Sequence, residues 1–102
     1  MLDSEITLCL YEFIKDSNDQ EIMTLVKETP VLAKEESLSN AFYFKSTAEG
    51  HRLSTSYLVH PFEYSGEQRV KARGKLLKVE RVRPVTKYDL DLLEIMVGEL
   101  DG

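Results

Sequence analysis

The side chains most able to do chemistry are few and scattered in this sequence. The single thiol is Cys9, and the imidazoles are His51 and His60. A zinc site usually takes about four ligands from cysteine, histidine and carboxylate side chains, and two histidines without a cysteine cluster do not supply them. The five glycines are dispersed, and they form neither phosphate-binding glycine motif nor a GxSxG nucleophile elbow. We therefore predict no metal, no cofactor and no catalytic residue, and a protein that is not an enzyme.

Cys9 has an ordinary structural interpretation. It lies within an apolar stripe and, as a free cysteine, behaves as a small hydrophobic residue. Because one thiol forms no internal disulfide, we predict that Cys9 belongs to the core and that alanine there costs stability rather than activity.

The charge distribution is the most distinctive property of the chain, whose net charge is −5. Residues 67–87 carry 8 basic and 2 acidic side chains, whereas residues 1–66 carry 5 basic and 11 acidic ones. Residues 88–102 carry 5 acidic side chains and no basic one. A basic segment therefore stands between two acidic ones.

Basic and apolar residues alternate strictly at the start of this basic segment. Because alternate residues of a strand face the same way, its first four cations would form one row, roughly 20 Å long. The row comprises Arg69, Lys71, Arg73 and Lys75, with Arg81 and Arg83 as an extension. Such a row could follow a phosphate backbone, with Tyr43, Tyr57 or Tyr64 as stacking platforms for bases.

The row also has an internal explanation. The basic strand could face acidic helices of the same molecule, or its charges could protect a sheet edge against aggregation. The net charge would repel a polyanion at a distance. We therefore rank a structural role or a protein partner above nucleic acid.

Three helices are predicted to position these residues. The first carries the stripe Ile6, Cys9, Leu10, Phe13 and Ile14, which recurs with helical spacing. A break at residues 16–19 separates it from a second helix, which contains Ile22, Leu25 and Val26 and ends before Pro30. The last helix begins at Thr86 with Asp89 as its capping partner, and carries the stripe Leu90, Leu93, Met96, Val97 and Leu100.

Strands are predicted between the second and the last helix. Phe42 and Phe44 alternate with polar neighbours, residues 52–64 are rich in β-formers, and Pro61 favours an edge or a kink. Residues 69–85 change phase twice, so Gly74 indicates either a bulge or a break into two strands. Residues 31–40 stay ambiguous, with a short strand at 31–33 as one possibility. A winged helix-turn-helix with a recognition helix at 34–40 is a lower-ranked arrangement.

The fold class expected is therefore α+β, as one domain over residues 1–102. It has two N-terminal helices, an antiparallel meander of three to four strands, and a C-terminal helix packed on one face of the sheet. We predict a small non-catalytic protein-interaction or regulatory domain, with nucleic-acid binding through residues 69–83 as the alternative. We expect a protein partner or self-association, no membrane, and the cytoplasm, since no signal peptide or membrane segment is recognisable. The predicted contact residues are Tyr57, Tyr64, Arg69, Lys71, Arg73, Lys75, Arg81 and Arg83.

Overall fold

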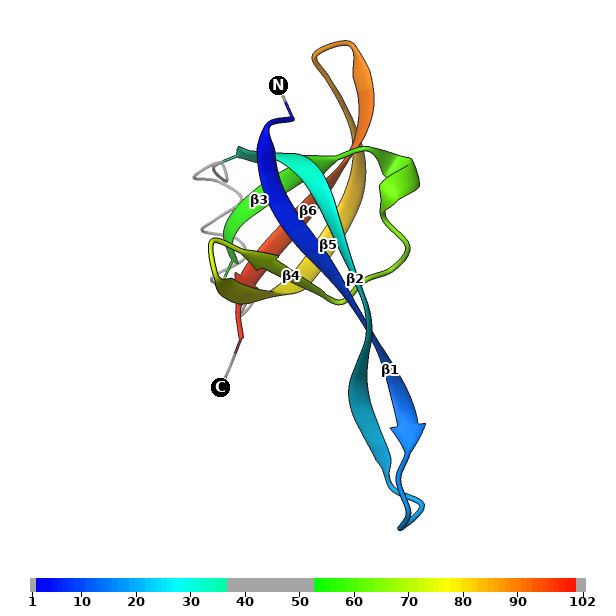
Figure 1. The fold of residues 1–102 in the computed structure, drawn as a ribbon. Coiled ribbons are helices and arrows are strands. Elements are labelled where there is room, and N and C mark those ends of the chain that lie inside the picture. The colour runs from blue at the N-terminus through cyan, green and yellow to red at the C-terminus, as the bar shows by residue number, and fades with distance from the viewer. Residues whose placement is uncertain (1, 37–52, 101–102) are drawn as a thin grey trace.

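Six antiparallel strands close into a barrel in the computed structural model, which describes residues 2–36 and 53–100 (Figure 1). The strands follow the order β1-β2-β3-β6-β5-β4, and β4 returns to pair with β1. A 3-10 turn, η1, connects β3 to the segment before β4. The elements are β1 (Ser4–Lys15), β2 (Glu21–Glu36), β3 (Leu53–Val59), η1 (Pro61–Glu63), β4 (Arg69–Ala72), β5 (Lys75–Lys87) and β6 (Leu90–Glu99).

Apolar side chains at alternate positions of the strands fill the inside of the barrel. Registered neighbours meet there, for example Leu8 with Val70 and Tyr57 with Ile95. The buried core cluster is Ile6, Leu8, Val31, Ala33, Tyr57, Val59, Val70, Ala72, Leu77, Ile95 and Val97. Because side chains alternate across a strand, the charged residues between these positions lie on the outside.

The α+β fold class is wrong, because all three predicted helices are strands. The helical stripe of the first segment leaves out Leu8, which is fully buried between Ile6 and Leu10 on β1. Nearly every residue from Ile6 to Leu10 is apolar, so a helical period and a strand period fit equally well. The second predicted helix is part of β2, which passes through Pro30 and includes the possible strand at 31–33.

The capping signal of the predicted last helix marks a hairpin. Tyr88 and Asp89 have φ values of 56° and 58° and connect β5 to β6. Two consecutive residues with positive φ are typical of the tight turns whose twist matches that of antiparallel strands. Asp89 therefore belongs to a turn, and the stripe after it is β6, with Ile95 and Val97 inside the barrel.

The two phase changes in residues 69–85 each have a structural cause. Arg73 and Gly74 form a turn with φ values of 54° and 74°, which confirms the predicted break into two strands and gives β4 and β5. The second change is a bulge in β5 between Val79 and Arg81. The extra residue brings Val82 back to the barrel interior.

Several other predictions have definite outcomes. The break at residues 16–19 is confirmed as the loop between β1 and β2, and Pro61 begins η1. The predicted strand at residues 42–44 lies outside the described residues, as does most of the possible helix at 34–40, whose first three residues belong to β2. No described helix has the length and apolar character needed to span a bilayer.

Candidate interaction surface

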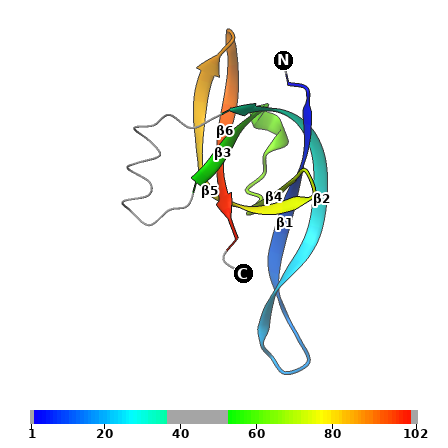
Figure 2. The ribbon, with the colours of Figure 1, turned by 90° about the vertical axis from the view of Figure 1, so that its left-hand side faces the viewer.

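A two-stranded ribbon projects from the barrel and forms its most unusual feature (Figures 1 and 2). We call it the arm and define it as residues 11–26, the distal parts of β1 and β2 with their connecting loop. β4 pairs with β1 only at Thr7–Cys9, and β3 pairs with β2 only at Lys34–Glu36. Among the residues that the structure describes, no strand therefore pairs with either long edge of the arm.

The arm carries most of the exposed large apolar side chains of the described chain. Six of the nine such residues lie on it, with exposed fractions from 37% to 69%. They are Phe13, Ile14, Ile22, Met23, Leu25 and Val26. Scattered exposed apolar residues are normal, whereas a contiguous group indicates a contact site. The arm thus has the composition of a binding surface.

The register of β1 with β2 sorts these side chains onto two faces. Directly opposed residues share a face, so Tyr11 with Leu25 and Phe13 with Met23 form one apolar surface. We call this surface the outer face, because Tyr11 and Phe13 continue the outward-pointing positions of β1. Lys15 and Glu21 end it at the tip.

The opposite face of the arm carries fewer apolar side chains. It carries the pair Ile14 and Ile22, followed toward the barrel by Glu12 and Thr24. A bulge between Leu10 and Tyr11 marks the boundary with the barrel and leaves Val26 as the extra residue on β2. The outer face is therefore the more continuous apolar surface.

Two side chains hold the root of the arm against the barrel. The Gln68 side-chain amide receives a hydrogen bond from Tyr11 N and donates one to Tyr11 O, both at 2.9 Å. The Gln68 side chain thus bonds the β1 backbone two residues beyond Cys9, where the pairing of β4 with β1 ends. The Arg69 guanidinium lies 4.7 Å from the centre of the Tyr11 ring, a cation–π geometry, and Nη2 lies 3.8 Å from Met23 Sδ. These contacts fix the direction of the arm.

The tip of the arm is also ordered by local hydrogen bonds. Asp16 Oδ1 accepts from Asn18 N at 2.8 Å and from Gln20 N at 3.0 Å. Asp19, with a φ of 60°, donates from its backbone N to Asp16 O at 3.1 Å. An aspartate that bonds its own following backbone is a common way to close a loop, so the apolar pairs are presented by a defined ribbon.

The predicted cation row does not lie on one strand. Arg69 and Lys71 are on β4, Arg73 is in the turn, and Lys75 is on β5 opposite Ala72. Arg81 and Arg83 lie further along β5, after the bulge. The prediction of a single straight row is therefore wrong, because the chain reverses at Gly74.

Several of these cations meet carboxylates from the two acidic segments. Arg73 pairs with Glu35 on β2. Two cations of β5 pair with carboxylates of β6. Lys75 Nζ lies 3.7 Å from an oxygen of Glu99, and Arg83 Nε lies 2.8 Å from Glu94 Oε1. These contacts fit the internal explanation of the basic segment, with acidic strands in place of acidic helices.

The two predicted tyrosine contacts face inward. Tyr57 is 3% exposed and belongs to the barrel core. Tyr64 packs against that core, and its hydroxyl donates to Glu67 O at 2.9 Å. Neither ring is a stacking platform, and Tyr43 lies outside the described residues. Both residues are structural.

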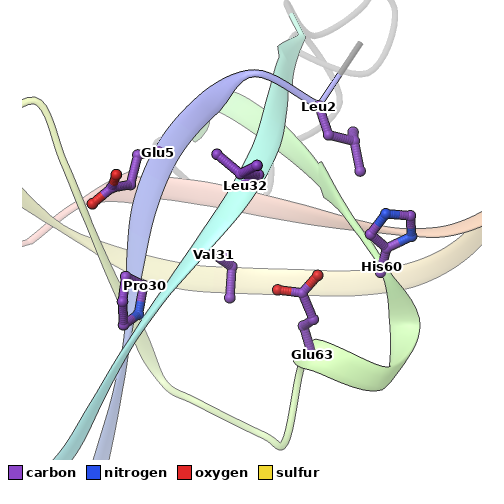
Figure 3. A pocket seen from close by; sticks show the side chains of 7 residues that line it. All are labelled: Leu2, Glu5, Pro30, Val31, Leu32, His60 and Glu63. Carbon is purple, nitrogen blue, oxygen red and sulfur yellow. The ribbon is translucent and has the colours of Figure 1, made fainter.

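Two hollows flank η1, and the larger is lined by the His60 imidazole and by the carboxylates of Glu5 and Glu63. The larger, about 440 Å³, has Val31 and Leu32 of β2 on one side and His60 and Glu63 on the other (Figure 3). The smaller, about 240 Å³, also touches Glu63. The His60 ring stacks on Phe62 with the centroids 5.3 Å apart. Within the described residues, no three histidine, cysteine or acidic side chains are grouped to hold a metal ion, and His51 lies outside them.

Cys9 is buried, as predicted, with 1% of its surface exposed. Burial raises the pKa of its thiol, and Glu28 raises it further, whereas Lys71 and Arg69 act in the opposite direction. The thiol therefore stays neutral at physiological pH and is a poor nucleophile.

The same burial predicts lower stability in alkaline solution. The pKa values of Tyr57 and Tyr64 are also raised, mainly by burial. Each group is neutral when protonated, so its contribution is complete below its ordinary pKa and is lost as the pH rises through the raised value. We expect the free energy of unfolding, measured in urea, to fall above about pH 9. The fall should be shallower in Tyr57→Phe, and an equal slope in both proteins would contradict this cause.

Sequence reasoning missed the arm, although one signal for it was present. Apolar residues flank the polar loop on both sides, with Phe13 and Ile14 before it and Ile22 and Met23 after it. Such symmetry about a turn is typical of a hairpin. Neither a protein-family model nor a curated protein sequence matches the chain.

Proposed function

We propose that this protein is a non-catalytic protein-interaction module whose contact element is the arm. The observation that carries the proposal is the group of six exposed large apolar side chains on a ribbon that the barrel does not cover. We also propose the cytoplasm as its compartment, supported by its single free thiol.

The packing of the barrel supports this proposal. None of the core cluster residues lies within residues 11–26, so the apolar side chains of the arm have no part in filling the barrel. A two-stranded ribbon is marginally stable in water by itself, and apolar pairs on it gain burial only when a partner covers them. The contacts of Gln68 and Arg69 at the root reduce the entropy lost on binding.

The nucleic-acid alternative stays a prediction. It depended on a straight row of cations, whereas Arg73, Lys75 and Arg83 each lie within salt-bridge distance of a carboxylate. Phosphate groups would have to compete with these internal carboxylates. We therefore treat nucleic-acid binding as an outcome of the following test.

The test compares an arm variant with a control variant at an exposed apolar residue outside the arm. The arm variant is Phe13→Ser combined with Met23→Ser, and the control is Phe62→Ser, whose ring is 81% exposed on η1. Each tagged protein is recovered from its native cells with and without nuclease, after circular dichroism has verified its fold. We expect the partner protein to be lost with the arm variant only, and to persist through nuclease treatment. Equal recovery with both variants, or loss on nuclease treatment, would contradict the proposal.

A further inference from the structure

We infer that the barrel carries a second contact site, a groove between β2 and η1, which binds an extended peptide with a lysine or arginine side chain from a partner protein. The groove consists of the two hollows that flank η1, which share Glu63 and follow one another along β2. Its β2 residues lie between Lys27 and Leu32, outside the arm. The inference therefore does not depend on the arm.

The backbone of β2 is open along this groove. β3 pairs with β2 only from Lys34 onward, and no backbone hydrogen bond joins the described residues 27–33 of β2 to those at 60–67. Pro30 fits such a position, because proline inside a sheet is typical of an edge that no strand covers. An uncovered edge can take an extended peptide as an additional strand. The edge from Lys27 to Leu32 spans roughly 17 Å at about 3.3 Å per residue, which suits a peptide of about six residues.

A buried carboxylate in the smaller hollow lacks a cation. Glu67 is 4% exposed, and its Oε1 accepts a hydrogen bond from Ser65 N. Within the part of the chain that the structure describes, its Oε2 accepts no hydrogen bond, and neither Glu67 nor Glu63 forms a salt bridge. A buried charge without a counter-charge is costly, so a cation that enters the hollow gains from both carboxylates. The smaller hollow therefore fits the end of a lysine or arginine side chain.

The apolar lining of the groove favours a peptide over a small free amine. Leu10 and Phe62 line the smaller hollow and can contact the methylene stem of the inserted side chain. The larger hollow has Val31 and Leu32 along β2, and the Glu63 carboxylate points toward β2 from η1 (Figure 3). Because alternate residues of a strand face the same way, an apolar side chain two positions along the peptide can enter this larger hollow.

A displayed library of random dodecapeptides, selected on the wild-type protein, provides the probe. We expect the enriched peptides to share one basic residue within a run of β-forming residues. The tightest of them is then titrated with the variants by fluorescence anisotropy.

Single charge changes test the place of the cation. Glu67→Gln keeps an acceptor for Ser65 N and removes the charge, so we expect it to weaken binding about tenfold or more. Lys27→Met removes an exposed cation from the smaller hollow and should strengthen binding. Glu99→Gln makes the same charge change on β6, where the side chain is 57% exposed, and is the control that should leave binding unchanged.

N-methylation of the peptide tests strand addition. In an added strand, alternate N–H groups point to the neighbouring strand, so methylation should abolish binding at one set of alternate positions and be tolerated at the other. Equal tolerance at all positions would overturn the inference. So would a selection without basic peptides, or an unchanged affinity in Glu67→Gln whose fold circular dichroism has verified.

The arm variant separates this inference from the proposed function. Phe13→Ser with Met23→Ser should bind the selected peptide normally, and loss of binding there would place the peptide on the arm and overturn the groove. If the peptide depends on Glu67 while recovery of a partner does not depend on the arm, the groove stands and the proposed function fails. The opposite pair of results leaves the proposed function and removes the groove.

Discussion

Replacement of Tyr57 by alanine is expected to lower the free energy of unfolding by about 3–5 kcal/mol. The ring is 3% exposed, lies inside the barrel and is registered with Ile95 of β6. The substitution loses the free energy gained by moving a large side chain out of water. It also leaves a cavity that the closed barrel cannot easily fill by rearranging. A domain of this size has a total stability of roughly 5–15 kcal/mol, so a large part would be lost. Urea denaturation followed by circular dichroism measures it.

Tyr57→Phe is the matched control for this substitution. It keeps the ring and removes only the hydroxyl, so we expect a change within about 1.5 kcal/mol. If Tyr57→Ala retained wild-type stability but lost a binding partner, the side chain would be a surface contact. That result would contradict its place in the barrel core.

Sequence reasoning predicted strands well where the two faces of a strand differ. In β4, Val70 and Ala72 are buried and Lys71 is exposed, which is the simple alternation that identifies a half-buried strand. The turn at Gly74 was also predicted, as one of two options. These features depend on residues close in sequence, and local pattern is sufficient for them.

The same reasoning failed where both faces of a strand carry apolar residues. On β6 the residues from Ile95 to Val97 are all buried, although alternate ones point to opposite sides. A run of this kind satisfies helical spacing as readily as strand spacing. The decision between them is tertiary: β6 fills the gap between β3 and β5 and closes the barrel. No local signal contains that information.

The candidate site was missed for a related reason. The apolar residues of the arm have the same types as core residues. They are exposed because β4 pairs with β1 no further than Cys9 and β3 pairs with β2 only from Lys34 onward. The Gln68 amide that bonds the Tyr11 backbone acts across 57 positions of sequence. Such contacts follow from the closed barrel, and a prediction that placed helices in these segments could not include them. The charge pattern, in contrast, did indicate that basic and acidic segments would meet.

Substitution of Arg83 tests how strongly the ion pairs between the basic and acidic segments stabilise the barrel. Glu94 is 6% exposed on the outside of β6, between Leu58 of β3 and Arg83 of β5, and its carboxylate accepts a hydrogen bond of 2.8 Å from Arg83 Nε. Arg83→Met would leave this carboxylate buried without its cation. Breaking a fully buried pair costs about 3–5 kcal/mol, but the Arg83 side chain is 54% exposed and solvent screens part of the interaction. We therefore expect a loss of about 1–3 kcal/mol.

The comparison with an exposed pair decides whether burial is the cause. Lys75 and Glu99 are 3.7 Å apart with side chains 63% and 57% exposed, so Lys75→Met should cost no more than about 1 kcal/mol. In a Glu94→Gln background the effect of Arg83→Met should shrink, because a neutral amide needs no counter-charge, and a double-mutant cycle in urea measures that coupling. Equal losses for Arg83→Met and Lys75→Met, or no coupling between Arg83 and Glu94, would mean that the basic segment does not stabilise the barrel through its buried carboxylate. The cations would then be more available to an external partner than their internal pairing implies.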